Sequence, residues 1–98
     1  MTWTVIYHPD VPDDLRRLGR AEAGRVVAAI DKRIRHGEPD KFGKLLRHDL
    51  AGCRRIRVGE TRIVFRVDAR AIEVLVIAVG PRRDDEIYLR AGKRSRSR

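Results

Sequence analysis

The sequence has one cysteine among its 98 residues, and this scarcity excludes two kinds of structure. A single cysteine cannot form an internal disulfide, and it cannot supply the several ligands at fixed spacing that a cysteine-based zinc site needs. No two of the three histidines have ligand-like spacing, so we expect neither a bound metal nor a cofactor. Cys53 lies where a strand should begin, which favours a small buried hydrophobic side chain over a nucleophile.

Long apolar segments are also lacking. No stretch approaches the ~20 apolar residues that a membrane-spanning helix needs, and no secretory signal peptide is recognisable. We therefore expect a cytoplasmic protein that makes no contact with membranes.

Acidic residues are outnumbered by basic ones. The chain has 23 Lys and Arg against 14 Asp and Glu, which gives a formal net charge of +9. Such an excess in a small domain favours nucleic acid or another acidic partner, and a merely soluble basic surface is the alternative. We expect one folded domain over residues 1–92. Residues 93–98, KRSRSR, should form a basic, disordered tail because like charges repel and nothing in it can pack.

Apolar periodicity and turn residues predict the order β-α-α-β-β-β, followed by a short C-terminal helix. The expected fold class is α+β, a small single domain with two N-terminal helices packed on one face of a four-stranded, mainly antiparallel sheet. The opposite sheet face should then stay open. The second helix is expected to bury Ala23, Val26, Val27, Ile30 and Ile34. The expected segments are a strand over 2–7, helices over 10–19 and about 22–36, a connecting loop over 38–52, a hairpin over 53–67, a strand over 72–79 and a helix from near Asp84.

The most informative segment is CRRIRVGETRIVFRV, residues 53–67, which is typical of a β-hairpin. Side chains alternate between the two faces of a strand, so one face of this hairpin is apolar and the other is rich in arginine. The planar guanidinium group matches the geometry of phosphate. A sheet face with fixed arginines therefore predicts a surface for a polyanion. The arginines expected on it are Arg55, Arg57, Arg62 and Arg66.

Two phrases, RRIRVGETRIVFRVD and VGPRRDDEIY, carry a family resemblance. They contain R-x-G-[DE]-x-R-[IV] and G-x-R-x(4–5)-Y in the order and spacing of the RelE/ParE superfamily of bacterial toxins, which the chain resembles over about residues 2–90. The segments DDLRRL and GKLLRHDLAG also fit the family pattern. The resemblance implies a RelE-like fold and a toxin of a type II toxin–antitoxin system.

The resemblance also implies an activity and partners. RelE-type toxins cleave mRNA in the ribosomal A site, whereas ParE-type toxins poison DNA gyrase. The basic and tyrosine residues favour the RelE branch, and therefore a metal-independent, ribosome-dependent endoribonuclease, or mRNA interferase, that inhibits translation. The implied partners are the ribosome, mRNA and a RelB-like antitoxin, acidic and partly disordered, that forms a hetero-oligomer with the toxin. A gyrase poison and a catalytically inactive nucleic-acid-binding relative are the alternatives.

The family pattern assigns site residues with two departures. The RelE type has lysines at the positions of Arg55 and Arg57, and many relatives have His or Lys at the position of Pro81. The implied catalytic residues are Arg55, Arg57, Arg62, Arg82 and Tyr88. Beyond the family pattern, the residues expected to bind RNA are Lys44, His48, Arg54, Arg66 and Arg83.

Metal-independent RNA cleavage uses the ribose 2′-OH as the nucleophile, and it needs a base, an acid and positive charge on the phosphorane. Arginine supplies the charge but stays protonated, so it is a poor base. Tyr88 is suited to stacking on a base or to donating a proton to the leaving oxygen. Three sources of the base stay open: a carboxylate of Glu60 or Glu86, the imidazole of His48, or groups of the ribosome.

Overall fold

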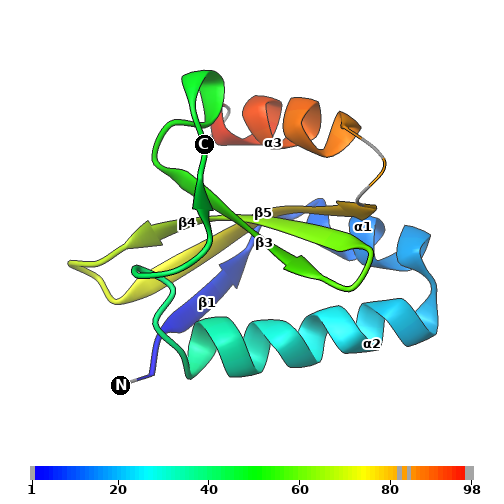
Figure 1. The fold of residues 1–98 in the computed structure, drawn as a ribbon, viewed down its shortest axis with the longest axis horizontal. Helices are drawn as coiled ribbons and strands as arrows, with labels where there is room; N and C mark the ends of the chain where they lie inside the picture. The colour runs from blue at the N-terminus through cyan, green and yellow to red at the C-terminus, as the bar shows by residue number, and fades with distance from the viewer. Residues whose placement is uncertain (1, 82, 84, 97–98) are drawn as a thin grey trace.

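A computed structural model describes residues 2–81, 83 and 85–96, and it confirms an α+β domain. Figure 1 shows three layers, with a sheet between helices α1 and α2 on one side and helix α3 on the other. The elements are β1 Thr4–Tyr7, α1 Val11–Leu18, α2 Arg20–Ala29, the π-helical η1 Ile30–Arg35, β2 Lys44–Leu45, the 3-10 turn η2 His48–Leu50, β3 Cys53–Val58, β4 Thr61–Asp68, β5 Glu73–Pro81 and α3 Glu86–Arg96.

The sheet has the strand order β1-β5-β4-β3-β2. Only the pairing of β1 with β5 is parallel, and the other neighbours are antiparallel. The predicted hairpin forms β3 and β4, with Arg57 directly opposite Arg62. Its turn contains Gly59 at φ +57°, a left-handed conformation that glycine adopts without steric cost. A register shift between Val64 and Phe65 interrupts the ladder to β5.

The N-terminal helices form where the sequence predicts them. Pro12 and two acidic residues, Asp13 and Asp14, occupy the first turn of α1, where carboxylates complement the helix dipole. The second predicted helix is α2 continued by η1, whose last turn widens so that the His36 N–H donates to the Asp31 carbonyl. Val26, Ile30 and Ile34 are buried as expected, whereas the prediction for Val27 is wrong because this side chain is 45% exposed.

Each face of the sheet has its own apolar core. The larger core lies between the sheet and the two N-terminal helices, and its buried residues include Trp3, Val26, Ile30, Ile34, Ile63 and Phe65. The smaller core lies between the sheet and α3, and its buried residues include Leu50, Cys53, Val64, Ile77, Ile87 and Ala91. Cys53 is therefore the small buried side chain that its position at the start of β3 indicated.

Three expectations about the architecture are wrong. The sheet has five strands because the connecting loop contains β2, whose two residues are too few to show a periodic pattern. The second sheet face is not fully open because α3 packs on it through Ile87 and Ala91. Residues 93–96 are not a disordered tail, since α3 continues to Arg96 and the side chain of Arg94 is largely buried. Residues 97 and 98 lie outside the described residues.

The edge of β5 lacks a strand partner beyond the point where β1 ends. β1 pairs with residues 73–76 only, so the following backbone groups need other partners. The Val79 N–H donates to Asp14 Oδ2 over 3.0 Å, and Arg94 donates to the Ile77 carbonyl over 2.9 Å. Arg90 donates to the Val79 carbonyl over 3.2 Å. Helices α1 and α3 thus complete this edge with side chains.

We predict that Asp14→Ala lowers the free energy of unfolding by about 3–5 kcal/mol. The loss follows because Asp14 is 2% exposed and its removal leaves a buried guanidinium and a buried N–H without their acceptor. Urea denaturation measures it. Asp13→Ala is the matched control, because Asp13 forms only an exposed pair with Arg16 that is worth ~0–1 kcal/mol. Equal losses in the two variants would contradict the prediction.

A second polar contact joins α2 to the start of β4. The buried Thr61 hydroxyl donates to Glu22 Oε2 over 2.7 Å, and Arg25 donates to Glu22 Oε1 over 2.8 Å. The hydrogen bond from Thr61, followed by that from Arg25, holds the pKa of Glu22 below its usual value of 4.5. The ionised carboxylate therefore stabilises the fold above the unfolded-state pKa, and this contribution is lost as the pH falls through the lower folded-state pKa.

We predict that Thr61→Val flattens the pH dependence of the melting temperature below about pH 4.5, since it removes the main cause of the lowered Glu22 pKa. Thermal melts between acidic and neutral pH measure the slope. Thr4→Val, at an exposed strand position, is the control and should leave the slope unchanged. A slope that Thr61→Val does not alter would show that the hydroxyl does not govern this titration.

Candidate nucleic-acid interface

The strand register places the predicted arginines on one sheet face. Residues that lie directly opposite each other in an antiparallel pair point to the same face. Arg57 lies opposite Arg62, Lys44 lies opposite Arg55, and Cys53 lies opposite Arg66. We call the set formed by Arg55, Arg57, Arg62 and Arg66 the arginine face. It lies on the side of the sheet on which α3 packs.

Tyr88, in the first turns of α3, contacts two members of the arginine face. Arg55 Nη1 donates to the Tyr88 hydroxyl over 3.0 Å. The guanidinium of Arg62 lies over the Tyr88 ring, 5.4 Å from its centroid, within the range of a cation–π contact. These contacts bring together Arg55, Arg62 and Tyr88, three residues that the family pattern assigned from distant parts of the chain.

Arg62 also has an acidic partner that sequence reasoning missed. Its Nη1 lies 3.2 Å from Asp85 Oδ1, and the side chains are 14% and 89% exposed, respectively. Asp85 thus occupies the place beside Arg62 where an anion would bind. The sequence offers one signal for this contact, the acidic pair that follows Arg82 and Arg83, but the position of Asp85 beside β4 is needed to see it.

The Nε–H groups of Arg55 and Arg62 are buried without a hydrogen-bond acceptor among the described residues. Buried donors of this kind are costly to leave unpaired. Because they are shielded from solvent, an incoming anion first meets the Nη groups. The exposed Arg57 extends the arginine face toward solvent, and its backbone carbonyl accepts a hydrogen bond from Arg33 over 2.8 Å.

The remaining predicted residues are more scattered. Lys44 is exposed beside Arg55, and His48 is exposed in η2 at φ +56°. Arg66 contacts Ser95 of α3. Arg83 is exposed in the turn before α3. Arg82 lies outside the described residues.

Arg54 does not join the arginine face. It points to the opposite side of β3 from Arg55 and donates to the carbonyls of Asp40 and Phe42 over 2.9 and 3.1 Å. Its guanidinium thereby holds the loop between η1 and β2. Arg54 thus lies apart from the other predicted residues because neighbours on a strand point to opposite faces, and RNA binding by Arg54 stays a prediction.

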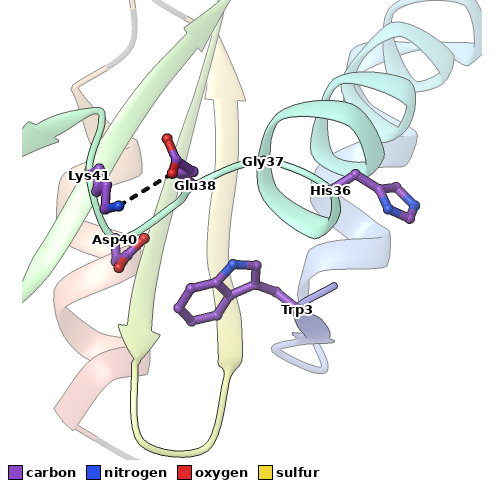
Figure 2. Close-up of a pocket in the computed structure, with 6 residues that line it drawn as sticks. All are labelled: Trp3, His36, Gly37, Glu38, Asp40 and Lys41. Carbon is purple, nitrogen blue, oxygen red and sulfur yellow. Dashed lines mark hydrogen bonds and ion pairs between the residues drawn. The ribbon is translucent and has the colours of Figure 1, made fainter. Parts of the chain in front are cut away.

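A hollow of about 250 Å³ lies at the loop that Arg54 holds, away from the arginine face. Figure 2 shows its lining, with the Trp3 indole facing the loop and Lys41 paired to Glu38 over 3.3 Å. The lining residues are Trp3, His36, Gly37, Glu38, Asp40 and Lys41. None of them belongs to the predicted site.

Neither a metal centre nor a membrane span is present in the described part of the chain. Within residues 2–81, 83 and 85–96, no three His, Cys, Asp or Glu side chains gather closely enough to hold a metal ion. None of the helices in these ranges combines the length and apolarity needed to cross a membrane.

Comparisons with known proteins agree on one family. The family model described as the ParE toxin of the type II toxin–antitoxin system, parDE, matches residues 5–86. The solved toxin–antitoxin complex RelBE2 from Mycobacterium tuberculosis is 28% identical, covers 86% of this chain and 95% of its own, and superimposes with a TM-score of 0.77. Among curated proteins, the comparison finds no match.

Two further structures share the fold. A variant of the Escherichia coli toxin RelE in the free state, in which two arginines are replaced by alanine, is 21% identical, with coverage of 96% and 98% and a TM-score of 0.74. The archaeal RelE–RelB complex from Pyrococcus horikoshii is 22% identical, with coverage of 84% and 97% and a TM-score of 0.64.

We predict that Arg57→Ala weakens binding to a short single-stranded RNA and lowers the slope of log K against log salt by about 0.7, the contribution of one phosphate contact. Fluorescence anisotropy over a salt series measures both effects. Arg17→Ala, which removes an equally exposed arginine from α1, is the control. If both variants changed binding by the same amount, the RNA would be responding to net charge rather than to the arginine face.

Proposed function

Because the chain belongs to the ParE toxin family of type II toxin–antitoxin systems, within the RelE/ParE superfamily, we propose that it inhibits translation as a ribosome-dependent endoribonuclease. The observation that supports this activity is the Tyr88 side chain, whose hydroxyl accepts a hydrogen bond from Arg55 and whose ring lies under the guanidinium of Arg62 on the arginine face. A phenol between two fixed cations joins a proton donor to the positive charge that phosphodiester cleavage needs. The substrate is mRNA in the ribosomal A site.

The proposed reaction is an attack by the ribose 2′-oxygen on the adjacent phosphorus. The new 2′-O–P bond forms as the P–O5′ bond breaks, which yields a 2′,3′-cyclic phosphate and a free 5′-hydroxyl. Arg57, Arg62 and Arg82 stabilise the charge of the phosphorane, and Tyr88 gives its proton to the 5′-oxygen. An electrostatic contact of this kind is worth on the order of 10²–10³ in rate.

The ribosome supplies the proton acceptor for the 2′-OH in this proposal. Arginine stays protonated in proteins, so Arg55 and Arg57 do not act as bases where the RelE type has lysines. The domain then contributes positioning and charge, and free RNA, which lacks the ribosomal groups, is not cleaved. This division of roles requires the protein to act in the cytoplasm.

An antitoxin is the second proposed partner. The similar structures from M. tuberculosis and P. horikoshii are toxin–antitoxin complexes. A net charge of +9 favours an acidic partner for this chain. We propose a RelB-like antitoxin that is acidic, partly disordered and ordered on binding, in a hetero-oligomer with the toxin.

Gyrase inhibition is the second candidate function, and a specific observation favours it: the matching family model is that of ParE toxins. A ParE-type poison would bind gyrase as a protein and would need no catalytic groups. Cleavage of mRNA therefore requires the arginine face and Tyr88 as catalytic groups, whereas inhibition of gyrase does not.

We predict that mapping of mRNA 5′ ends in a translating extract shows cuts at fixed codon positions only when ribosomes are present. Arg62→Ala and Tyr88→Phe should each slow this cleavage by about 10²-fold or more. Arg17→Ala, which removes one positive charge from α1, is the control for the effect of net charge alone. If mRNA stays intact and DNA supercoiling by gyrase is inhibited instead, the ParE-type function replaces the proposal.

A further inference from the structure

Helices α1 and α3 lie on either side of β5 (Figure 1), and a buried ion pair between their side chains joins them at the unpaired edge of this strand. Asp14 of α1 is 2% exposed, and it accepts two hydrogen bonds from Arg94 of α3. Arg94 Nη1 lies 2.7 Å from Asp14 Oδ2, and Arg94 Nη2 lies 3.0 Å from Asp14 Oδ1. This two-bond geometry fixes both the distance and the orientation of the guanidinium.

The same groups bind the backbone of β5, so the pair holds α3 to the sheet as well as to α1. Arg94 Nη1 also donates to the Ile77 carbonyl, and Asp14 Oδ2 also accepts from the Val79 N–H. Arg90, one turn earlier on α3, donates to the Val79 carbonyl and lies 3.8 Å from Asp14. The last turns of α3 are therefore fixed relative to β5 by directional contacts.

The start of α3 carries Tyr88, roughly 9 Å along the helix from Arg94 at 1.5 Å per residue. Around Tyr88, α3 packs on the sheet through the apolar side chains of Ile87, just before it, and Ala91, one turn after it, and Arg90 donates to the Val79 carbonyl. Apolar contacts are non-directional, so they hold a helix against a sheet without fixing how far it slides or rotates. The 3.0 Å hydrogen bond between Arg55 and Tyr88 tolerates only a small displacement.

Gly80 shows how closely α3 is seated. A Cβ atom at this position would lie 2.8 Å from Arg90 Nη2 and 3.3 Å from Ile87 Cβ. The strand thus has no side chain where α3 approaches it, and this keeps the helix at one distance from β5. The contacts of Arg94 with Asp14 and the Ile77 carbonyl, together with the hydrogen bond from Arg90 to the Val79 carbonyl, then fix the position of α3 along the strand edge.

From these contacts we propose that Asp14 and Arg94 are positioning residues, whose ion pair sets α3 in register with β5 and so places the Tyr88 hydroxyl against Arg55 and the Tyr88 ring against Arg62. This inference rests on the proposed role of Tyr88 in RNA cleavage. In this proposal Asp14 and Arg94, which lie far from the arginine face, align the proton donor Tyr88. A buried pair contributes little net stability over apolar packing, and the fixing of one arrangement is its better-attested use.

The test replaces Arg94 with Met, which keeps an unbranched chain but removes the charge and the donors. Arg94→Lys retains the charge, and Lys93→Met is the matched control because Lys93 is exposed on the same helix. The chain has two tyrosines, so Tyr7 is replaced by Phe and the protein is labelled with 3-fluorotyrosine. The single ¹⁹F signal then reports the surroundings of the Tyr88 phenol. Ribosome-dependent mRNA cleavage is measured on the same proteins.

We expect the Tyr88 signal of Arg94→Met to move to the position found in an Arg55→Ala variant, with cleavage slowed at least tenfold and KM nearly unchanged. Arg94→Lys keeps the charge but loses the two-bond geometry, so its signal and rate should lie between those of Arg94→Met and the parent, and Lys93→Met should match the parent in both. A parent-like signal in an Arg94→Met protein that melts cooperatively would overturn the inference.

If Arg94→Met does not fold, Arg94→Gln replaces it, because Gln keeps an N–H donor for the Ile77 carbonyl while losing the charge. The ¹⁹F signal and the cleavage rate of Arg94→Gln are then compared with those of the parent in the same way. The ¹⁹F measurement tests the position of Tyr88 even if the protein shows no cleavage activity. If the parent cleaves no mRNA, the proposed function fails, whereas an unmoved fluorine signal rejects the positioning role alone.

Discussion

The fold depends on how one strand edge is completed. β1 is four residues long and leaves the second half of β5 without a strand neighbour on that side. Buried backbone groups must be paired, and here the carboxylate of Asp14 and two arginines of α3 do so. Because the partners come from α1 and α3, the same contacts hold both helix layers on the sheet.

The position of Tyr88 against the arginine face depends on the same arrangement. With α3 seated on the second sheet face, Tyr88 reaches Arg55 and Arg62, and the turn before the helix brings Asp85 to Arg62. The guanidiniums are held by a rigid hairpin on one side and by a helix on the other. Fixed charges of this kind need little reorganisation when an anion arrives.

Much of this could be read from the sequence, because alternation in the hairpin and periodicity in the helices report burial directly. The arginine face and the helix order depended on such local patterns, whereas the role of Tyr88 came from the family resemblance and stays a prediction. The two-residue β2, the contact of Asp85 with Arg62 and the pair between Asp14 and Arg94 did not, since each joins segments distant along the chain. The tail was misread because a run of charges was judged by repulsion alone, although Arg94 has a buried acidic partner.

The exposed carboxylate of Asp85 has a consequence for ligand choice. Because it is tethered to the same chain, it competes for Arg62 at an effective concentration on the order of millimolar. A free inorganic anion offers one contact and has to match that concentration to displace it. A polymer that presents phosphates to Arg55, Arg57 and Arg62 together gains from multivalency and replaces Asp85 readily. If Arg62 binds RNA as proposed, the tethered carboxylate of Asp85 weakens the binding of a single phosphate more than the binding of a chain of phosphates, which also contacts the neighbouring arginines.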